Sequence, residues 1–260
     1  MRMEDVIFTR VGGVKTACLS RKQLVDLIVQ RSLDYKDPFF AFSAPLTVLD
    51  SNGQAVSLAN SNAEFKKALE DADIVHADGQ SIVSFSRWFS DNPIPERTAT
   101  TDTIHDIPTY FDGTLRHFLL GGTKQVVKQC GDILSSKYAN FKVAGVRDGY
   151  FSAEEESRVV DEINEAKPDV LWVGLGKPKE QRFVKNNKNK LKVPVIITCG
   201  GCYNYITGDY KRAPEIFQKT GFEWLHRAAT EPRKLLWRYL TTNPHTIYCV
   251  LKHRHKKHAE

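Results

Sequence analysis

Short apolar runs alternate with amphipathic stretches of helical period from about residue 21 to residue 201. Each apolar run ends in a turn rich in glycine or small residues, and the next stretch carries apolar residues at the spacing of one helix face. This pattern predicts strands at 39–43, 73–77, 116–120, 141–146, 169–173 and 193–198. It predicts helices at 62–72, 123–138, 153–167 and 178–191, whose starts are marked by Asn, Thr, Ser or Pro.

Strands that alternate with helices favour an α/β fold with a Rossmann-like, mostly parallel sheet flanked by helices. In such folds ligands bind at the carboxyl ends of the strands. The alternation stops after Gly208, where a basic segment of helical character begins. We therefore expect an α/β core at residues 1–207 and a basic, helical C-terminal appendage at residues 208–260.

The net charge of the chain is concentrated in this last fifth. Residues 208–260 hold eleven Lys and Arg against five Asp and Glu, a balance of +6 that equals the formal charge of the whole chain. Large apolar residues such as Trp224, Trp237 and Tyr239 alternate with the cations. This pattern is typical of a helix with one apolar and one basic face that binds phosphates or an anionic surface. A solvated basic terminus, and burial of the aromatic residues in a homo-oligomer, are the alternatives.

The composition limits which class of protein this chain can be and in which cellular compartment it can lie. With 260 residues, 41% of them hydrophobic, the chain can bury a full core as one large domain or as one domain with an appendage. No run approaches the ~18 apolar residues that span a bilayer, and residues 1–10 lack the apolar core of a signal peptide. Five cysteines form an odd, sparse set, unlike a disulfide framework. We expect a cytoplasmic protein with reduced thiols, peripheral at most on the inner face of the membrane.

An acid follows the second predicted strand, in the segment Ile74-Val-His-Ala-Asp78-Gly79. The glycine permits close approach of the backbone before a helix starts, so the carboxylate is presented at the edge of the sheet. Asp78 could simply cap the following helix. Its functional role would be that of a general base, which accepts a proton from an attacking hydroxyl.

Two other strand ends are followed by glycines and a helix start, at Gly121-Gly122-Thr123 and at Gly174-Leu-Gly176-Lys177. Free backbone N–H groups and the helix dipole favour a phosphate at such turns. Neither turn completes the three-glycine dinucleotide fingerprint, because Lys179 stands where the second turn would need its third glycine. The two turns together fit a nucleotide diphosphate and disfavour NAD.

Three more motifs resemble metal-binding or redox sites, but each has a simpler structural explanation. Asp71-Ala-Asp73 is an acid pair of the kind that holds metals, but it lies where a helix passes into a strand rather than beyond a strand end. Cys199-Gly-Gly-Cys202 has redox spacing but follows a late strand, so turn geometry explains its glycines better. The closing segment 253–258, rich in His and Lys, fits a solvated basic end. We expect no metal ion and no other cofactor.

Several short segments follow one another along the chain. They are Ala77-Asp78-Gly79 with Arg97 and Asp102, Leu120-Gly-Gly-Thr123 with Gly149-Tyr-Phe151, Gly174-Leu-Gly-Lys-Pro-Lys179, Arg212-Ala-Pro214 with Glu223-Trp224, and Glu231-Pro-Arg233. In their order and spacing these segments resemble the bacterial glycosyltransferase family named for WecG, TagA and CpsF, and the resemblance covers most of the chain. Members of this family attach a sugar from a UDP-sugar to a lipid-linked acceptor during assembly of surface polysaccharides.

The resemblance implies roles for particular residues. Asp78 would be the catalytic base, with the hydroxyl of Ser43 beside it, and Arg97 would grip the donor or the acceptor. Basic residues of the appendage would fold over the active site and meet the diphosphate, namely Arg227, Arg233 or Lys234, and Arg238. The two glycine turns would bind the donor through Gly121, Gly122, Thr123, Gly174, Gly176, Lys177, Glu180 and Gln181.

Two departures from the family pattern bear on the choice of substrate. The family usually reads Gly-x-Pro-Lys-Gln-Glu, whereas this chain reads Gly176-Lys-Pro-Lys-Glu180-Gln181, with acid and amide exchanged. The first loop reads Ser43-Ala-Pro45-Leu in place of the usual Asn-Pro, and the stretch 51–62 is longer than typical. The choice of donor or acceptor can therefore differ from that of other members.

The resemblance thus implies an inverting, UDP-sugar-dependent and metal-independent glycosyltransferase. The donor sugar stays open between N-acetylmannosamine, its uronic acid and a hexose such as glucose, and the acceptor would be a saccharide linked to polyprenyl diphosphate. The amphipathic tail would dock on anionic headgroups. Two other classes remain as alternatives. An incomplete glycine fingerprint disfavours a nucleotide-binding oxidoreductase, and the neutral charge balance of residues 1–207 disfavours a nucleic-acid-binding module.

Overall fold

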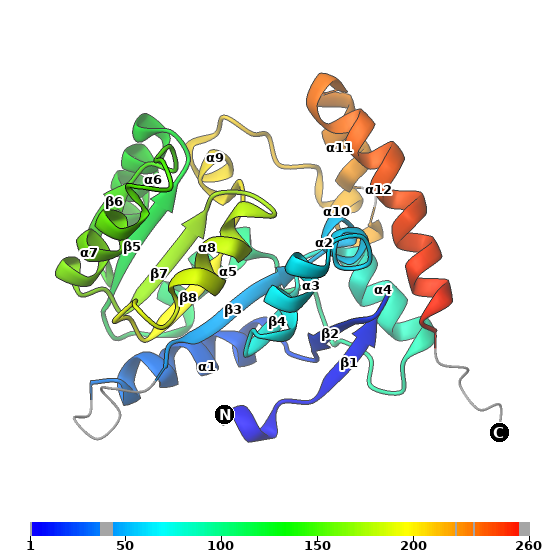
Figure 1. Cartoon of the computed structure of the whole chain (residues 1–260), viewed down its shortest axis with the longest axis horizontal. Helices are drawn as coiled ribbons and strands as arrows, with labels where there is room; N and C mark the ends of the chain where they lie inside the picture. Colours follow the sequence, from blue (N-terminus) through cyan, green and yellow to red (C-terminus); the bar gives the residue numbers. More distant parts are fainter. Residues whose placement is uncertain (1, 37–43, 222, 231, 255–260) are drawn as a thin grey trace.

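The computed structural model describes residues 2–36, 44–221, 223–230 and 232–254. Its centre is a six-stranded sheet with the order β4-β3-β8-β7-β5-β6, in which every pair of neighbours is parallel (Figure 1). The α/β, Rossmann-like prediction is confirmed. The strands are β3 (Leu46–Ser51), β4 (Ile74–Ala77), β5 (Leu115–Gly121), β6 (Phe141–Arg147), β7 (Val170–Gly174) and β8 (Val195–Thr198).

Helices cover both faces of this sheet because alternate side chains of each buried strand point to opposite sides. In β7, for example, Trp172 belongs to one hydrophobic cluster and Val173 to the other. The Val173 face packs against α2 (Gly53–Ala59), α3 (Ala63–Glu70), α4 (Gln80–Phe89), α7 (Glu156–Ala166) and α8 (Lys179–Asn187). The Trp172 face packs against α1 (Arg21–Asp34), α5 (Thr100–Tyr110), α6 (Lys124–Lys137) and α9 (Cys202–Thr207).

Most predicted elements match observed ones. The last five predicted strands are β4 to β8, and the four predicted helices are α3, α6, α7 and α8. The first predicted strand, 39–43, lies outside the described residues, and the strand found in this part of the chain is β3. The pattern did not predict β3 because the apolar run at residues 39–42 is uninterrupted, whereas Thr47 interrupts the run at 46–49. Asn52 is the N-cap of α2, and its side chain accepts from the N–H of Ala55.

An N-terminal hairpin was also not predicted from the sequence. After a short 3-10 helix (Met3–Asp5), β1 (Phe8–Val11) and β2 (Val14–Ala17) pair antiparallel through a tight turn. Gly12 and Gly13 in this turn both have positive φ, at 58° and 84°, which favours glycine. β2 lies against β4 and β1 against α4, so the hairpin extends the fold beside the edge of the sheet.

In the described part of the chain, three helices follow Gly208 and no strand follows β8. They are α10 (Glu215–Thr220), α11 (Glu223–Thr230) and the long α12 (Pro232–Lys252), which packs against α11 and α2 (Figure 1). Near the end of α12, Cys249 and Val250 join the hydrophobic cluster on the Val173 face of the sheet. The segment is therefore anchored in the main core at its far end. Residues 208–260 as a separate functional unit remain a prediction.

Candidate active site

The carboxyl ends of β3, β4, β7 and β8 surround a cavity of about 270 Å³. The helix after β3, α2, and the helix after β8, α9, cover opposite faces of the sheet. Because the loops after these neighbouring strands diverge, they leave a crevice of the kind that binds ligands in open α/β sheets. The C-terminal helices close the crevice and contribute Glu223, Trp224, Arg227, Arg238 and Tyr239 to its lining.

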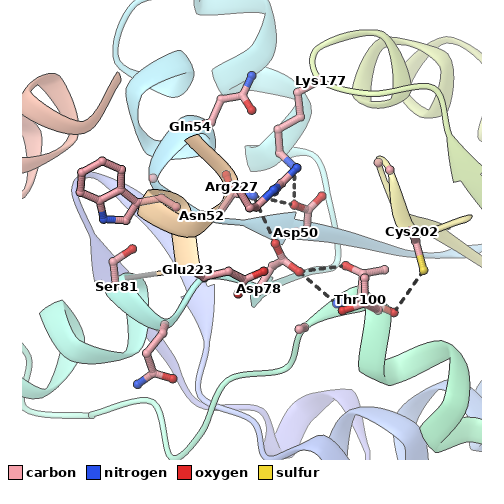
Figure 2. A pocket seen from close by; sticks show the side chains of 18 of the residues that line it. Asp50, Asn52, Gln54, Asp78, Ser81, Thr100, Lys177, Cys202, Glu223 and Arg227 are labelled. Carbon is pink, nitrogen blue, oxygen red and sulfur yellow. Dashed lines mark hydrogen bonds and ion pairs between the residues drawn. The ribbon is translucent and has the colours of Figure 1, made fainter. Parts of the chain in front are cut away.

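Asp78 lies at the end of β4, half-buried, and lines this cavity (Figure 2). Its Oδ1 accepts hydrogen bonds from the backbone N–H of Thr100 at 3.0 Å and from the Thr100 hydroxyl at 3.4 Å. Its Oδ2 accepts from Nδ2 of Asn52 at 3.2 Å. The N-cap of the following helix α4 is Gly79, without a side-chain cap, so the simple capping alternative does not hold for α4. Asp78 instead bonds the first N–H of a different helix, α5.

The charge state of Asp78 follows from these surroundings. Burial alone would raise the pKa of this carboxyl, but the positive charges of Lys177 and Arg97, the nearby His76 and the Thr100 N–H lower the pKa below its ordinary value. The N-terminal end of α5 is also a favourable position for an anion. Asp78 is therefore an ionised carboxylate at neutral pH, as a proton acceptor must be.

Beside Asp78, a buried lysine lies between two carboxylates. Nζ of Lys177 forms an ion pair with Asp50 and lies 3.8 Å from Oε1 of Glu180. The other Asp50 oxygen accepts from the Thr198 hydroxyl at 3.1 Å. Figure 2 shows Lys177 directed at Asp50 from the loop after β7. Burial alone would lower the pKa of Lys177, but Asp50, Glu180 and Asp78 together raise it, so the lysine stays charged.

Glu180 holds together two of the loops that line the cavity. Its Oε2 accepts the backbone N–H of Gly176, after β7, and that of Gly200, after β8, each at 3.0 Å. Burial is the main cause that raises the pKa of Glu180 to about 7, and Lys177 opposes it. Gln181 is buried behind Glu180 and is not part of the cavity lining. Their roles in donor binding remain predictions.

The predicted C-terminal cations separate into two groups. Arg227 and Arg238 line the cavity. Each guanidinium lies over an aromatic ring, that of Arg227 at 5.5 Å from the ring centroid of Tyr205 and that of Arg238 at 4.8 Å from the ring centroid of Tyr239. Nε of Arg238 is buried and has no hydrogen-bond partner among the described residues. Arg233 is exposed and outside the lining. The side chain of Lys234 lies outside the described residues, as does Ser43.

Arg97 joins the core to the C-terminal segment. Its guanidinium donates to Glu223 at 2.7 Å and to Gln218 at 3.2 Å, and lies 3.7 Å from Asp102. Asp102 in turn pairs with Arg212. Arg97 lines the cavity, but some of its N–H groups are already bonded to Glu223 and Gln218. Because these two partners belong to α11 and α10, Arg97 holds the α10–α11 region in place.

The first glycine turn lies apart from this cavity. None of Gly121, Gly122, Thr123 and Gly174 is in its lining. A Cβ on Gly121 would lie 2.2 Å from the carbonyl oxygen of Gly174, so glycine is needed here for the close packing of β5 on β7. Thr123 is the N-cap of α6, where it accepts from the N–H of Val126. The structure thus gives these residues local structural roles, and their contact with a donor remains a prediction.

The remaining motifs have structural partners. Asp73 accepts from the backbone N–H and hydroxyl of Thr47 at the opposite end of the sheet from the cavity. Cys199 and Cys202 are buried free thiols in the cavity lining, and burial raises the pKa of both. Within the described ranges, no three His, Cys, Asp or Glu side chains form a group suited to a metal ion. No described helix has the length and apolarity to cross a bilayer.

Sequence reasoning missed two residues at the end of β3. Asp50 and Asn52 reach the cavity beside Asp78, and Nδ2 of Asn52 lies within hydrogen-bond distance of both carboxylates, 3.4 Å from Asp50 and 3.2 Å from Asp78. The signal that could have found them is an acid directly after the apolar run Leu46-Thr-Val-Leu49. The sequence pattern favours a strand at residues 39–43 instead.

Comparison with known proteins identifies the family of this chain. The family described as "Glycosyl transferase WecG/TagA/CpsF family" matches residues 9–260. Similar proteins named N-acetylglucosaminyldiphosphoundecaprenol N-acetyl-beta-D-mannosaminyltransferase occur in Bacillus spizizenii strain W23, 27% identical over 79% of both chains, and in Bacillus subtilis strain 168, 28% identical over 79% of both chains. The protein of this name in Staphylococcus aureus strain NCTC 8325 is 28% identical over 81% of this chain and 82% of its own.

The family match covers nearly the whole chain, including the strand ends and the C-terminal helices that form the cavity. It excludes the oxidoreductase and the non-catalytic nucleic-acid-binding alternatives. The chain belongs to the WecG/TagA/CpsF family and is a glycosyltransferase.

Proposed function

We propose that this enzyme transfers a sugar from a UDP-sugar to a saccharide linked to polyprenyl diphosphate, with inversion at the anomeric carbon. The printed names of the relatives support an acceptor of this class, because they specify N-acetylglucosaminyldiphosphoundecaprenol. One observation carries the proposal: the ionised Asp78 faces a cavity whose walls also present Lys177, Arg227 and Arg238. A base and a set of cations in one crevice suit attack by a hydroxyl and departure of a diphosphate.

Asp78 acts as the general base in this proposal. An ionised carboxylate has about four lone-pair directions, and the described donors to Asp78 are Asn52 and two groups of Thr100. One direction is left for the hydroxyl of an acceptor sugar. With its low pKa, Asp78 takes the proton only as the new bond forms in the transition state.

The bond changes balance in a single displacement. The acceptor oxygen bonds to the anomeric carbon of the donor, its proton passes to Asp78, and the bond between the anomeric carbon and the phosphate oxygen breaks. UDP leaves with the electron pair, so negative charge grows on the diphosphate. Arg227 and Arg238, from α11 and α12, are placed to neutralise it without a metal ion in this proposal.

The lipid part of the acceptor must stay in the bilayer while its sugar reaches the cavity. We place the enzyme on the inner face of the cytoplasmic membrane, with α12 toward the lipid. Support comes from the apolar side chains that α12 exposes along its length, which are Leu236, Trp237, Leu240, Ile247, Tyr248 and Leu251. Burial of the same face in a homo-oligomer is the competing arrangement.

The test is transfer from a panel of UDP-sugars to a short-chain lipid-diphosphate-sugar acceptor, with and without EDTA, followed by UDP release and product mass. The panel includes UDP-N-acetylmannosamine, its uronic acid and UDP-glucose. Metal-independent transfer from one donor, with inverted anomeric configuration in the product, is expected. Absence of UDP binding overturns the proposal, and turnover that EDTA abolishes overturns its metal-free form.

A further inference from the structure

A second cavity lies at the far end of α12 from the active site. It has a volume of about 390 Å³ and is formed by three segments distant in sequence: the β1–β2 hairpin, the α2–α3 region and the last residues of α12. Arg238 lines the active site and Lys252 lines this second cavity. The 14 residues of helix between them correspond to about 21 Å.

The lining of this cavity is strongly basic. Its cations are Arg10 and Lys15 from the hairpin, Lys66 from α3, Lys252 at the end of α12 and Arg254 just after it, whereas Glu70 is the only acid among the described lining residues. Among the described residues, only Lys66 of these cations has an ion pair, with Glu70 at 3.8 Å. Folding thus gathers four further cations, Arg10, Lys15, Lys252 and Arg254, that no acid among the described residues pairs with. An anionic ligand would remove this repulsion.

The cavity is built by specific contacts rather than by loose surface lysines. Nδ2 of Asn60 donates to the carbonyl oxygen of Gly12 at 2.8 Å and fixes the hairpin turn on α2. A Cβ on Gly12 would lie 2.4 Å from Val56 of α2 and 3.4 Å from Val250 of α12, so the turn packs closely on both helices. The guanidinium of Arg10 is oriented by a hydrogen bond to the carbonyl oxygen of Gly13, at 3.2 Å.

Apolar side chains lie exposed next to these cations. Leu251 directly precedes Lys252 and is 45% exposed, and Ile247 and Tyr248 are exposed one turn earlier on α12. On the hairpin side, Ile7 is exposed, and Arg10 and Lys15 also line a shallow neighbouring hollow with Phe8. Cations that surround a hollow, with apolar residues beside it, are suited to the boundary between lipid headgroups and acyl chains.

We propose that this second cavity binds the phosphate group of an anionic lipid headgroup. The hairpin and α3 thereby share membrane binding with α12, and the headgroup fixes the orientation of the helix that closes the active site. The position at a bilayer rests on the proposed function. The recognition of a phosphate does not, because it depends only on the charges of the cavity.

The experiment measures binding of the full-length chain to phosphatidylcholine vesicles with and without phosphatidylglycerol. The test variant is Arg10→Gln/Lys66→Gln/Arg254→Gln, which removes one cation from each segment. Its matched control is Lys128→Gln/Lys142→Gln/Lys190→Gln, which removes the same charge at exposed positions that line neither cavity. Each cation near an anionic surface contributes about five-fold in affinity, so the test variant should bind roughly a hundred-fold more weakly. The control should change by no more than a few-fold.

A gain-of-binding variant guards against misfolding of the triple variant. Glu70→Gln removes the acid from the lining, and we expect a several-fold increase in affinity for the anionic vesicles. Equal losses in the test and control triples, or no gain from Glu70→Gln, would overturn the proposal. Transfer to the short-chain acceptor is measured in parallel, and we expect all variants to keep it. If the wild-type chain shows no transfer, the proposed function fails while the vesicle result stands.

Two further measurements distinguish a lipid headgroup from a free phosphate ion and from a nucleic acid as the ligand of this cavity. Inorganic phosphate is added in a thermal-shift experiment, and oligonucleotides are added at low salt. Thermal stabilisation by phosphate that the test triple loses, together with unchanged vesicle binding, would assign the cavity to a free anion and overturn the lipid assignment. Oligonucleotide binding that depends on these cations, without vesicle binding, would overturn it as well.

Discussion

Arg97 and Glu223 form an ion pair at 2.7 Å that joins the α/β core to a helix 126 residues later in the chain. Their side chains are 12% and 28% exposed, so the pair is shielded from much of the solvent. The contact holds α11, and with it Arg227, over the cavity.

Breaking this pair should loosen the closure of the active site. We expect Arg97→Gln and Glu223→Gln each to lower kcat/KM five- to ten-fold, which corresponds to about 1 kcal/mol for a charged hydrogen bond with partial exposure. The double variant should lose little more than either single variant. A double-mutant cycle on kcat/KM measures this coupling. Additive losses would show that the two residues act separately.

Asp78→Asn should abolish most of the transfer while leaving UDP bound. The amide keeps the shape of the side chain but cannot take the acceptor proton, so we expect kcat to fall by about 10²- to 10⁴-fold. The matched control is Asp71→Asn, the same change at an exposed residue before the opposite end of β4. Steady-state kinetics and calorimetric UDP binding provide the two readouts. Wild-type turnover by Asp78→Asn would remove it from the role of base.

The arginines of the C-terminal helices should differ in their importance. Arg227→Gln and Arg238→Gln remove cations from the cavity lining, and we expect kcat/KM to fall about ten- to a hundred-fold for each. Arg233→Gln changes an exposed residue outside the lining, so its effect should stay within about two-fold. Kinetics with saturating acceptor separate these outcomes. A loss at Arg233 equal to that at Arg227 would mean that α12 moves when substrate binds.

The raised pKa of Glu180 predicts a dependence of stability on pH. The folded protein holds the proton of Glu180 up to a pKa of about 7, whereas the ordinary value is 4.5. The protonated Glu180 therefore adds up to about 3 kcal/mol to the free energy of unfolding. This stabilisation is fully present below pH 4.5 and is lost as pH rises through about 7. Glu180→Gln cannot titrate, so its free energy of unfolding should decline less than that of the wild type across this range.

Urea unfolding at intervals from pH 4.5 to 8 measures this difference. Glu165→Gln, an exposed glutamate at the end of α7, serves as the control and should follow the wild-type curve. Parallel curves for Glu180→Gln and the wild type would show that Glu180 is ionised throughout.

Much of the fold was determined by the sequence itself. The strand–helix alternation predicted β4 to β8 and their helices, because each buried strand is a short apolar run that must be followed by a helix to cover the sheet. Asp78 was found because a polar residue directly after a parallel strand lies at the edge of the sheet where ligands bind. The concentration of positive charge after Gly208 likewise follows from composition alone.

Only the tertiary structure decided which side chains meet. Asp50 was not identified from the sequence, because its position beside Asp78 arises from the pairing of β3 with β4, between residues 26 positions apart. The division between Arg227 and Arg238 inside the cavity and Arg233 outside it arises from the packing of α12 on α2. The basic cavity joins segments from both ends of the chain. Local sequence specifies helices and strands through short-range periodicity, whereas contacts between distant segments depend on how these elements pack.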